Sequence, residues 1–325
     1  MATLGAVPAS RPTAKPALQV FSSRARVHSC SNIRPSHVPA SSHRHHNLFL
    51  VSSRRQATVA AAVKSEVDVA PWVEEARSKR LQQLEEQALD ALQKAVDNFE
   101  HPAFPCALIA GDVVILHLLH RLGVLSNNKV PVIFIDTFHL FPETHAFLKR
   151  LETNYSFQAR EFHADGFANK AEYKAKHGSD LYITDIDEYD RICKVEPFNR
   201  SLKTLDVDVM INGRRRDHGF ERAHLEVFEG GKPVKCNPLA YWEFRDCWDY
   251  LQLHKLEAHP LHDEGFPSVG DVHSTIPVPR EKWFEYAGER SGRFQGLQNK
   301  DGSVKTECGI HVGDDPETGM SNIRK

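Results

Sequence analysis

Cys308, near the C-terminus, is the residue best suited to covalent chemistry. It lies between Glu307 and Gly309, with His311 three positions later, and no other cysteine is close enough for a Cys-x-x-Cys dithiol. Only a thiolate is a good nucleophile; a base such as His311 lowers the pKa of a thiol, and an acid such as Glu307 opposes this. We therefore expect a nucleophilic thiol on a mobile tail that depends on an outside reductant. The alternative from composition is an inert thiol in a frayed terminus.

The strongest charge cluster is the run Gly213-Arg214-Arg215-Arg216-Asp217-His218, followed by Arg222. Arginine binds phosphate or sulfate through a planar fork of N–H donors. Because the run follows a predicted strand, it would present several guanidinium groups to one crevice, which favours an anionic ligand. A solvated basic turn is the alternative. Lys194 could reach the same anion, although such a lysine is often simply exposed.

These side chains need a scaffold, and the apolar runs predict one. A helix with a single apolar stripe is followed by short apolar strands that alternate with helices. This order is typical of βαβ units and predicts an α/β fold with a parallel sheet. The expected helices cover residues 72–96, 113–122, 142–151 and 242–253, and the expected strands cover residues 106–110, 130–135, 157–162 and 207–212.

Polar residues follow three of the predicted strands, and ligands of parallel sheets bind beyond such carboxyl ends. We expect these ends to converge: Ala110-Gly111-Asp112, Asp136-Thr137 and Asn212-Gly213-Arg214. Gly111 would let a phosphate meet a helix N-terminus, or serves turn geometry alone. Asp112 is a candidate N-cap. Asp136 and Thr137 either contact a ribose or adenine or cap the next helix.

Composition narrows the function classes. The chain has 325 residues, a net charge of −2 and 41% hydrophobic residues, so nothing indicates general nucleic-acid or membrane-surface binding. Its six cysteines are scattered, which argues against a disulfide framework and against a zinc or iron–sulfur site built from cysteines alone. No apolar run reaches the ~18 residues of a membrane span. His117 and His120 lack further ligands, so no zinc site is expected.

The N-terminal segment, residues 1–63, differs from the rest of the chain. It contains no aspartate or glutamate and is rich in Ser, Ala, Pro and Arg. These features are typical of an organelle transit peptide, and the Ser and Pro content favours the plastid stroma. We expect cleavage within residues 57–63 and a disordered segment before it. The alternative is a basic arm that binds a nucleic acid or a partner.

In order along the chain, several motifs resemble those of the phosphoadenylylsulfate (PAPS) and adenylylsulfate (APS) reductases. The resemblance implies a Rossmann-like sheet of the adenine nucleotide alpha-hydrolase (PP-loop) type over residues 64–302 and a flexible catalytic tail over residues 303–325. The matching motifs are Ile135-Asp136-Thr137, Leu140-Phe141-Pro142-Glu143-Thr144, Lys194-Val195-Glu196-Pro197, Gly213 to Ala223, Asp263-Glu264-Gly265, Ser268-Val269-Gly270-Asp271 and Glu307-Cys308-Gly309-Ile310-His311.

The resemblance also assigns roles. Cys308 would attack the sulfuryl sulfur, leaving AMP or adenosine 3',5'-bisphosphate and a cysteine S-sulfonate, from which thioredoxin releases sulfite. Arg215, Arg216 and Arg222 would hold the phosphosulfate by charge. Lys194 and His311 would assist them. The remaining substrate-binding candidates are the loop residues Gly111 and Asp112 and, beside the nucleotide, Asp136 and Thr137.

Departures from the family pattern carry information. Tyr189-Asp190 and the pair Asp271 and Ser274 stand where some APS reductases have four cluster-binding cysteines, so we expect no iron–sulfur cluster. Absence of a cluster is usual for PAPS-using members, whereas Gly111 to Val114 is similar to the APS-type loop. Plastid members generally use APS, so we expect a cluster-free plastid APS reductase of the moss type, with some use of PAPS. No hydroxyl side chain remains at residues 106–110. Residues 313–325 are too few for the thioredoxin-like domain of plant members, so we expect a separate thioredoxin or similar donor.

Other interpretations stay open at this point. A strictly PAPS-specific reductase is one of them. A second is an ATP pyrophosphatase or sulfurtransferase of the same fold, although the chain lacks the Ser-Gly-Gly-x-Asp-Ser loop that such enzymes need. A third is a non-catalytic nucleotide-binding protein, against which the retained Glu307-Cys308-Gly309 argues. The sequence also allows a homo-oligomer.

Overall fold

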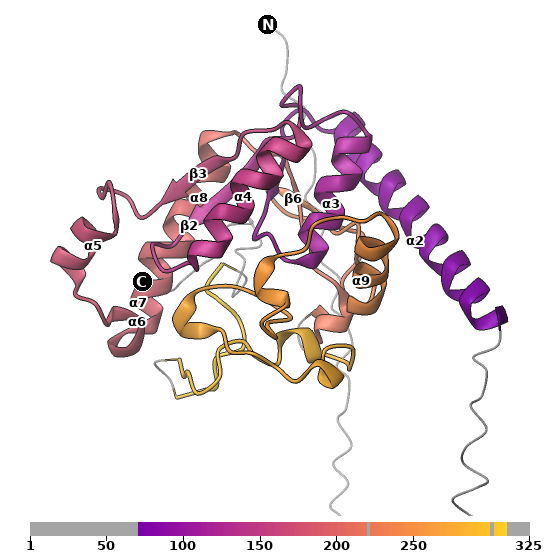
Figure 1. Cartoon of the computed structure of the whole chain (residues 1–325). Coiled ribbons are helices and arrows are strands. Elements are labelled where there is room, and N and C mark those ends of the chain that lie inside the picture. Colours follow the sequence, from indigo (N-terminus) through magenta and orange to yellow (C-terminus); the bar gives the residue numbers. More distant parts are fainter. Residues whose placement is uncertain (1–70, 220–221, 300–301, 311–325) are drawn as a thin grey trace, which may run out of the picture. The chain divides into compact units, whose positions relative to one another are not determined.

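A computed structural model of the chain describes residues 71–219, 222–299 and 302–310 (Figure 1). The predicted transit peptide, its cleavage site and His311 lie outside these residues. Among the helices that are described, none combines the length and the apolar character that a membrane crossing requires.

The centre of the fold is a six-stranded sheet with the order β3-β2-β1-β4-β6-β5. All neighbouring strands are parallel except β5, which runs antiparallel to β6 at one edge. The predicted α/β class with a parallel sheet is therefore confirmed. The strands are β1 Pro102–Pro105, β2 Val132–Asp136, β3 Arg160–His163, β4 Val209–Ile211, β5 Phe228–Glu229 and β6 Val234–Cys236.

Helices cover both faces of the sheet (Figure 1). On one face α2, α3, α4 and α9 share the larger core cluster with Phe104, Val132 and Ile211. On the other face α8 packs on Ala103 and Ile133. Successive strand residues point to opposite faces, which is the period of two expected of a strand. The helices are α2 Pro71–Asn98, α3 Ala110–Arg121, α4 Pro142–Tyr155, α5 Lys170–His177, α6 Leu181–Thr184, α7 Ile186–Asp190, α8 Glu196–Thr204 and α9 Phe244–Leu253.

The first strand corrects the sequence interpretation. It was expected at residues 106–110 but is Pro102–Pro105, and Ala110 already begins α3. The two prolines occupy the first and last positions of the strand, where a missing N–H is tolerated. Asp112 is not the N-cap of α3, a position held by Ile109; its carboxylate instead accepts a hydrogen bond from the Ala107 N–H at 2.7 Å. The other three expected strands match β2, β3 and β4 within a few residues.

A π-helical turn, η1 Arg191–Val195, joins α7 to α8 without a break. In a π-turn each N–H bonds five residues back, as the Glu196 N–H does to the Arg191 carbonyl. The wider turn contains Lys194 and Val195, the first two residues of the Lys194-Val195-Glu196-Pro197 motif. Such turns are frequent at functional sites, and this one presents Lys194 and Asp190 to the same buried space.

Candidate active site

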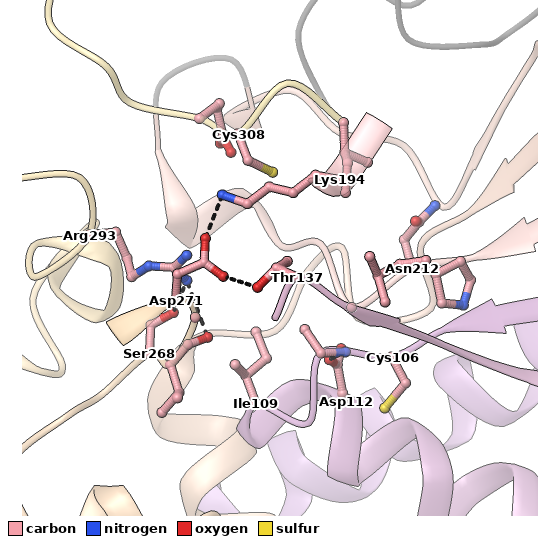
Figure 2. Close-up of a pocket in the computed structure, with 18 of the residues that line it drawn as sticks. Cys106, Ile109, Asp112, Thr137, Lys194, Asn212, Ser268, Asp271, Arg293 and Cys308 are labelled. Atoms are coloured by element: carbon pink, nitrogen blue, oxygen red, sulfur yellow. Dashed lines mark hydrogen bonds and ion pairs between the residues drawn. The ribbon is translucent and has the colours of Figure 1, made fainter. Parts of the chain in front are cut away.

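The carboxyl ends of β1, β2 and β4 meet at a cavity of about 220 Å³ (Figure 2). The three strand ends contribute Asp112, Thr137 and the segment Asn212-Gly213-Arg214, so the predicted convergence is confirmed. Gly111 and Asp136 lie beside the cavity but do not line it. A Cβ on Gly111 would lie 3.1 Å from Nη1 of Arg215, so a side chain here would press against that guanidinium.

One side of the cavity is apolar. Flat apolar walls suit a planar base, because they exclude water from both of its faces. The residues that form this side come from β1, β2 and α8 and from the segments that follow β1 and β2: Pro105, Ile109, Ile133, Phe134, Ile135, Leu140 and Phe198.

The other side of the cavity is cationic. Arg222 and Arg290 both line it, and each donates through Nη2 to the carboxylate of Glu307, at 2.8 and 2.9 Å. Burial lowers the pKa of Arg222 to about 10, and the neighbouring Arg290 acts in the same direction. Arg222 therefore stays protonated at neutral pH. Arg293, whose Nη1 donates to Ser268 Oγ at 3.3 Å, lies on the same side.

The arginines of the predicted cluster do not all face the cavity in the structure. Only Arg222 of the three predicted ligands lines the cavity, and the expectation that Arg215 and Arg216 face it is wrong. Arg215 is fully buried and ion-paired with Glu289 and, at 3.0 Å, with Asp217. Arg216 lies over the ring of Tyr241, 4.4 Å from its centroid, and pairs with Glu226 at 3.0 Å. Local carboxylates thus hold both side chains away from the crevice.

Lys194 lines the cavity as predicted and is buried between two carboxylates. Its Nζ lies 2.8 Å from Asp190 Oδ1 and 2.7 Å from Asp271 Oδ2. Burial alone would lower the pKa of Lys194, but the two carboxylates outweigh burial and raise it. Asp271 also accepts hydrogen bonds from Thr137 Oγ1 at 2.5 Å and Tyr189 Oη at 3.0 Å. Thr137 therefore orients the carboxylate that positions the lysine.

The tail brings Cys308 into the same cavity. Asp190 holds it there by accepting the Gly309 N–H at 3.1 Å and pairing with Lys305 at 2.9 Å. Figure 2 shows the sulfur directed towards the Lys194 side chain. Burial raises the pKa of Cys308, while Lys194 opposes this, so the resting thiol is protonated. The predicted approach of the thiol to a cationic crevice is present, although a base at His311 lies outside the described residues.

The four residues expected in place of cluster-binding cysteines are close together. Tyr189 and Ser274 both hydrogen-bond Asp271, at 3.0 Å to its carboxylate and 3.4 Å to its carbonyl. Lys194 bridges Asp190 and Asp271 through the centre of this group. Among residues 71–219, 222–299 and 302–310, no three His, Cys, Asp or Glu side chains are grouped as a metal site. The side chains at these four positions therefore make hydrogen bonds and ion pairs.

Sequence reasoning missed Arg290 and Arg293. Arg290 ends the 3₁₀ turn Gly288–Arg290 and Arg293 follows it, in a segment without helical or strand periodicity, so no pattern linked them to the sheet. The sequence signal that could have indicated them is the nearby glycines Gly270 and Gly292, which allow close packing. A Cβ on Gly270 would lie 2.2 Å from Nη2 of Arg293, and a Cβ on Gly292 would lie 2.4 Å from the Ile276 carbonyl. Glycine is required at both positions for the arginine to reach the cavity.

Comparisons with known proteins identify the family of the chain. Residues 101–277 match the family model described as the phosphoadenosine phosphosulfate reductase domain. A phosphoadenosine phosphosulfate reductase of Emericella nidulans is 36% identical over 72% of this chain and 73% of its own length. A phosphoadenosine 5'-phosphosulfate reductase of Zymomonas mobilis is 37% identical over 74% of this chain and 93% of its own.

A solved structure gives the same indication for the fold. The PAPS reductase of Candida auris, crystallised as a phosphate complex, is 29% identical and superposes with a TM-score of 0.52. The match covers 61% of this chain and 97% of that one. The sheet is thus of the Rossmann-like, PP-loop type that the motifs implied.

Proposed function

Because the chain belongs to the phosphoadenosine phosphosulfate reductase family, we propose that it reduces an adenylyl sulfate and releases sulfite. The observation that carries this proposal is the position of Cys308. Its thiol shares one cavity with Lys194, Arg222 and Arg290, although these residues are distant from one another in sequence. A nucleophile beside a cationic pocket is the arrangement that attack on a bound sulfate requires.

The cavity suggests how the substrate binds. The adenine would lie on the apolar side, near Ile135 and Phe198, and the phosphosulfate would lie on the cationic side. Guanidinium groups there neutralise negative charge on the sulfate, which otherwise repels an incoming thiolate. They also stabilise charge that develops on the leaving phosphate, so they lower the barrier more than they strengthen ground-state binding.

The proposed chemistry has two steps. The Cys308 thiol loses its proton and attacks the sulfuryl sulfur, a sulfur–sulfur bond forms, and the sulfur–oxygen bond breaks with its electron pair leaving on the phosphate of AMP. An external dithiol such as thioredoxin then attacks the Cys308 sulfur and expels sulfite. The second thiol of the dithiol resolves the mixed disulfide, so the dithiol supplies both electrons and ends as a disulfide.

We propose APS as the preferred nucleotide, with weaker use of PAPS, in the plastid and without an iron–sulfur cluster. Support comes from the Gly111 to Val114 loop, from the acid-free residues 1–63, and from the Tyr189, Asp190 and Asp271 side chains that occupy the candidate cluster positions with hydrogen bonds. A PAPS-specific reductase is the second candidate, favoured by the names of the relatives. Turnover on APS and PAPS with thioredoxin decides between them: a kcat/KM at least tenfold higher on PAPS would refute the APS preference.

The decisive experiment for the reaction uses Cys308→Ser. This variant should release no sulfite while binding AMP with unchanged affinity. Cys236→Ala is the matched control, because this buried thiol bonds the Ala91 carbonyl away from the cavity. In the unmodified chain mixed with APS and no reductant, mass spectrometry should find a sulfonate on the Cys308 peptide. Sulfite release by Cys308→Ser, or a sulfonate on Cys106 instead, would contradict the mechanism.

A further inference from the structure

The carboxylate of Glu307 occupies the cationic side of the cavity. Its Oε2 accepts from Nη2 of Arg222 at 2.8 Å and from Nη2 of Arg290 at 2.9 Å. The Glu307 side chain is only 10% exposed, and that of Arg222 only 6%. These two guanidinium groups are therefore already engaged by an anion that the chain itself supplies.

The arginines retain unused hydrogen-bonding capacity. Nε of Arg222 and Nε of Arg293 are buried and have no hydrogen-bond partner among the described residues. A buried donor without a partner is unfavourable. Glu307 satisfies one donor of Arg222 through a single oxygen, whereas a tetrahedral sulfate or phosphate has enough oxygens for several donors. The site thus suits an oxyanion better than it suits the carboxylate now present.

Glu307 is also linked to the nucleophile. It precedes Cys308, and Nη2 of Arg290 donates to the Thr306 carbonyl at 3.0 Å as well as to the Glu307 carboxylate. On the far side of Cys308, Asp190 accepts the Gly309 N–H. The cavity beneath this segment measures about 220 Å³, and pockets for drug-sized ligands are typically about 300–1,000 Å³. With Glu307 in place, the cavity is thus smaller than a typical ligand pocket.

We propose that Glu307 is an internal competitor for the oxyanion of the substrate, and that a bound sulfate or phosphate displaces it and releases the segment that carries Cys308. The identity of the oxyanion as part of an adenylyl sulfate rests on the proposed function; the competition itself does not. Without substrate, the carboxylate keeps the segment docked over the cavity. When an oxyanion binds, the segment loses its hold on Arg222 and Arg290, while Asp190 still accepts the Gly309 N–H, so Cys308 gains freedom to move but stays at the cavity where it would attack.

The proposed competition should lower the apparent affinity for an anion by a measurable factor. When only a fraction of molecules can bind, the apparent affinity falls by that fraction. A segment docked in nine of ten molecules would weaken anion binding about tenfold. Glu307→Gln removes the charge that holds the segment on the arginines, so it should recover about this factor.

The experiment measures two quantities without any turnover. The first is the rate at which iodoacetamide alkylates Cys308, followed by peptide mass spectrometry, in sodium sulfate and in sodium chloride of equal ionic strength. The second is the dissociation constant of AMP from calorimetry. Both are measured for the unmodified chain, for Glu307→Gln and for Glu281→Gln, a control that removes the same charge from an exposed position.

The proposal predicts that sulfate accelerates Cys308 alkylation several-fold over chloride in the unmodified chain and in Glu281→Gln. In Glu307→Gln, alkylation should be fast in both salts, and AMP should bind about tenfold more tightly. Equal rates in the two salts for the unmodified chain, or unchanged AMP affinity in Glu307→Gln, would overturn it. If these results hold but APS yields no sulfite, the competition is supported and the proposed reaction is refuted. If APS yields sulfite but the alkylation rates and the AMP affinity do not change as predicted, the reaction is supported and the competition is refuted.

Discussion

Replacing Lys194 by methionine should destabilise the fold strongly, because it removes the cation between two buried carboxylates. Asp190 keeps a partner, since Lys305 lies 2.9 Å from its other oxygen. Asp271 loses its closest cation: His273, at 3.8 Å, is neutral at pH 7 because burial lowers its pKa to about 4, and Arg293 attracts Asp271 from farther away. One buried carboxylate is left without its ion-pair partner, which costs about 3–5 kcal/mol.

The pH dependence of this loss follows from Asp271. Burial alone would raise its pKa, but Lys194 outweighs burial and holds the pKa below its ordinary value. In the unmodified chain this depressed pKa contributes stability at all pH values above the pKa of the unfolded state. Without Lys194, burial loses its largest opponent and only weaker effects such as the Thr137 hydrogen bond remain, so we expect the folded variant to take up a proton more readily than the unfolded chain. The deficit of Lys194→Met should therefore shrink between pH 7.5 and pH 5.5.

Urea unfolding followed by circular dichroism at the two pH values measures both effects. Lys149→Met is the matched control, because Lys149 also meets two carboxylates, Glu152 at 3.1 Å and Glu161 at 3.0 Å, but its side chain is 64% exposed. That exposed lysine should contribute less than about 1 kcal/mol. A loss below about 1 kcal/mol for Lys194→Met, or a deficit that grows towards pH 5.5, would refute the assignment of Lys194 as the neutralising charge.

Two further predictions concern acid stability and metal content. Burial, and then the neighbouring His262, lower the pKa of His259 to about 3, so below pH 6.5 the unfolded chain binds more protons and the unfolding free energy decreases as the pH is lowered. In urea titrations between pH 6.5 and 4.5, His259→Gln should reduce this slope by up to about 1.4 kcal/mol per pH unit. An unchanged slope would contradict the prediction. The purified chain should be colourless, and elemental analysis that finds stoichiometric iron would disprove the cluster-free assignment.

The sequence predicted the sheet better than it predicted the side chains of the site. The predicted strands 130–135 and 207–212 are mainly apolar runs; β4 lies within the second, and β2 overlaps the first and ends one residue later, at Asp136. The first strand was misplaced because Pro102 and Pro105 suggested a break, whereas both lie at strand ends in the structure. The apolar pattern therefore located β2 and β4, the neighbours of β1 in the sheet, but not the ends of β1 itself.

Side-chain direction within the arginine run could not be predicted. Arg215 and Arg222 belong to the same basic segment, yet one is buried in the scaffold and the other lines the cavity. The difference arises from Glu289, which pairs with Arg215 and lies 74 residues later in the chain. No local spacing encodes that contact. Cys308, by contrast, was found from its sequence motif, because the motif and the reactive atom are the same few residues.

The position of Lys194 depends on the one extra residue that the π-turn at Arg191–Val195 contains. An ordinary α-helical turn would need one residue fewer, and later side chains would then rotate by roughly 100° about the axis. The continuous helix would accept such a deletion, and α8 would keep its backbone hydrogen bonds. Lys194, however, would leave the aspartates on either side of it. A gene shortened by one codon here could thus encode a chain that keeps its helices but leaves Asp271 without its lysine, with a stability cost like that of Lys194→Met. Selection for stability would therefore also preserve this turn.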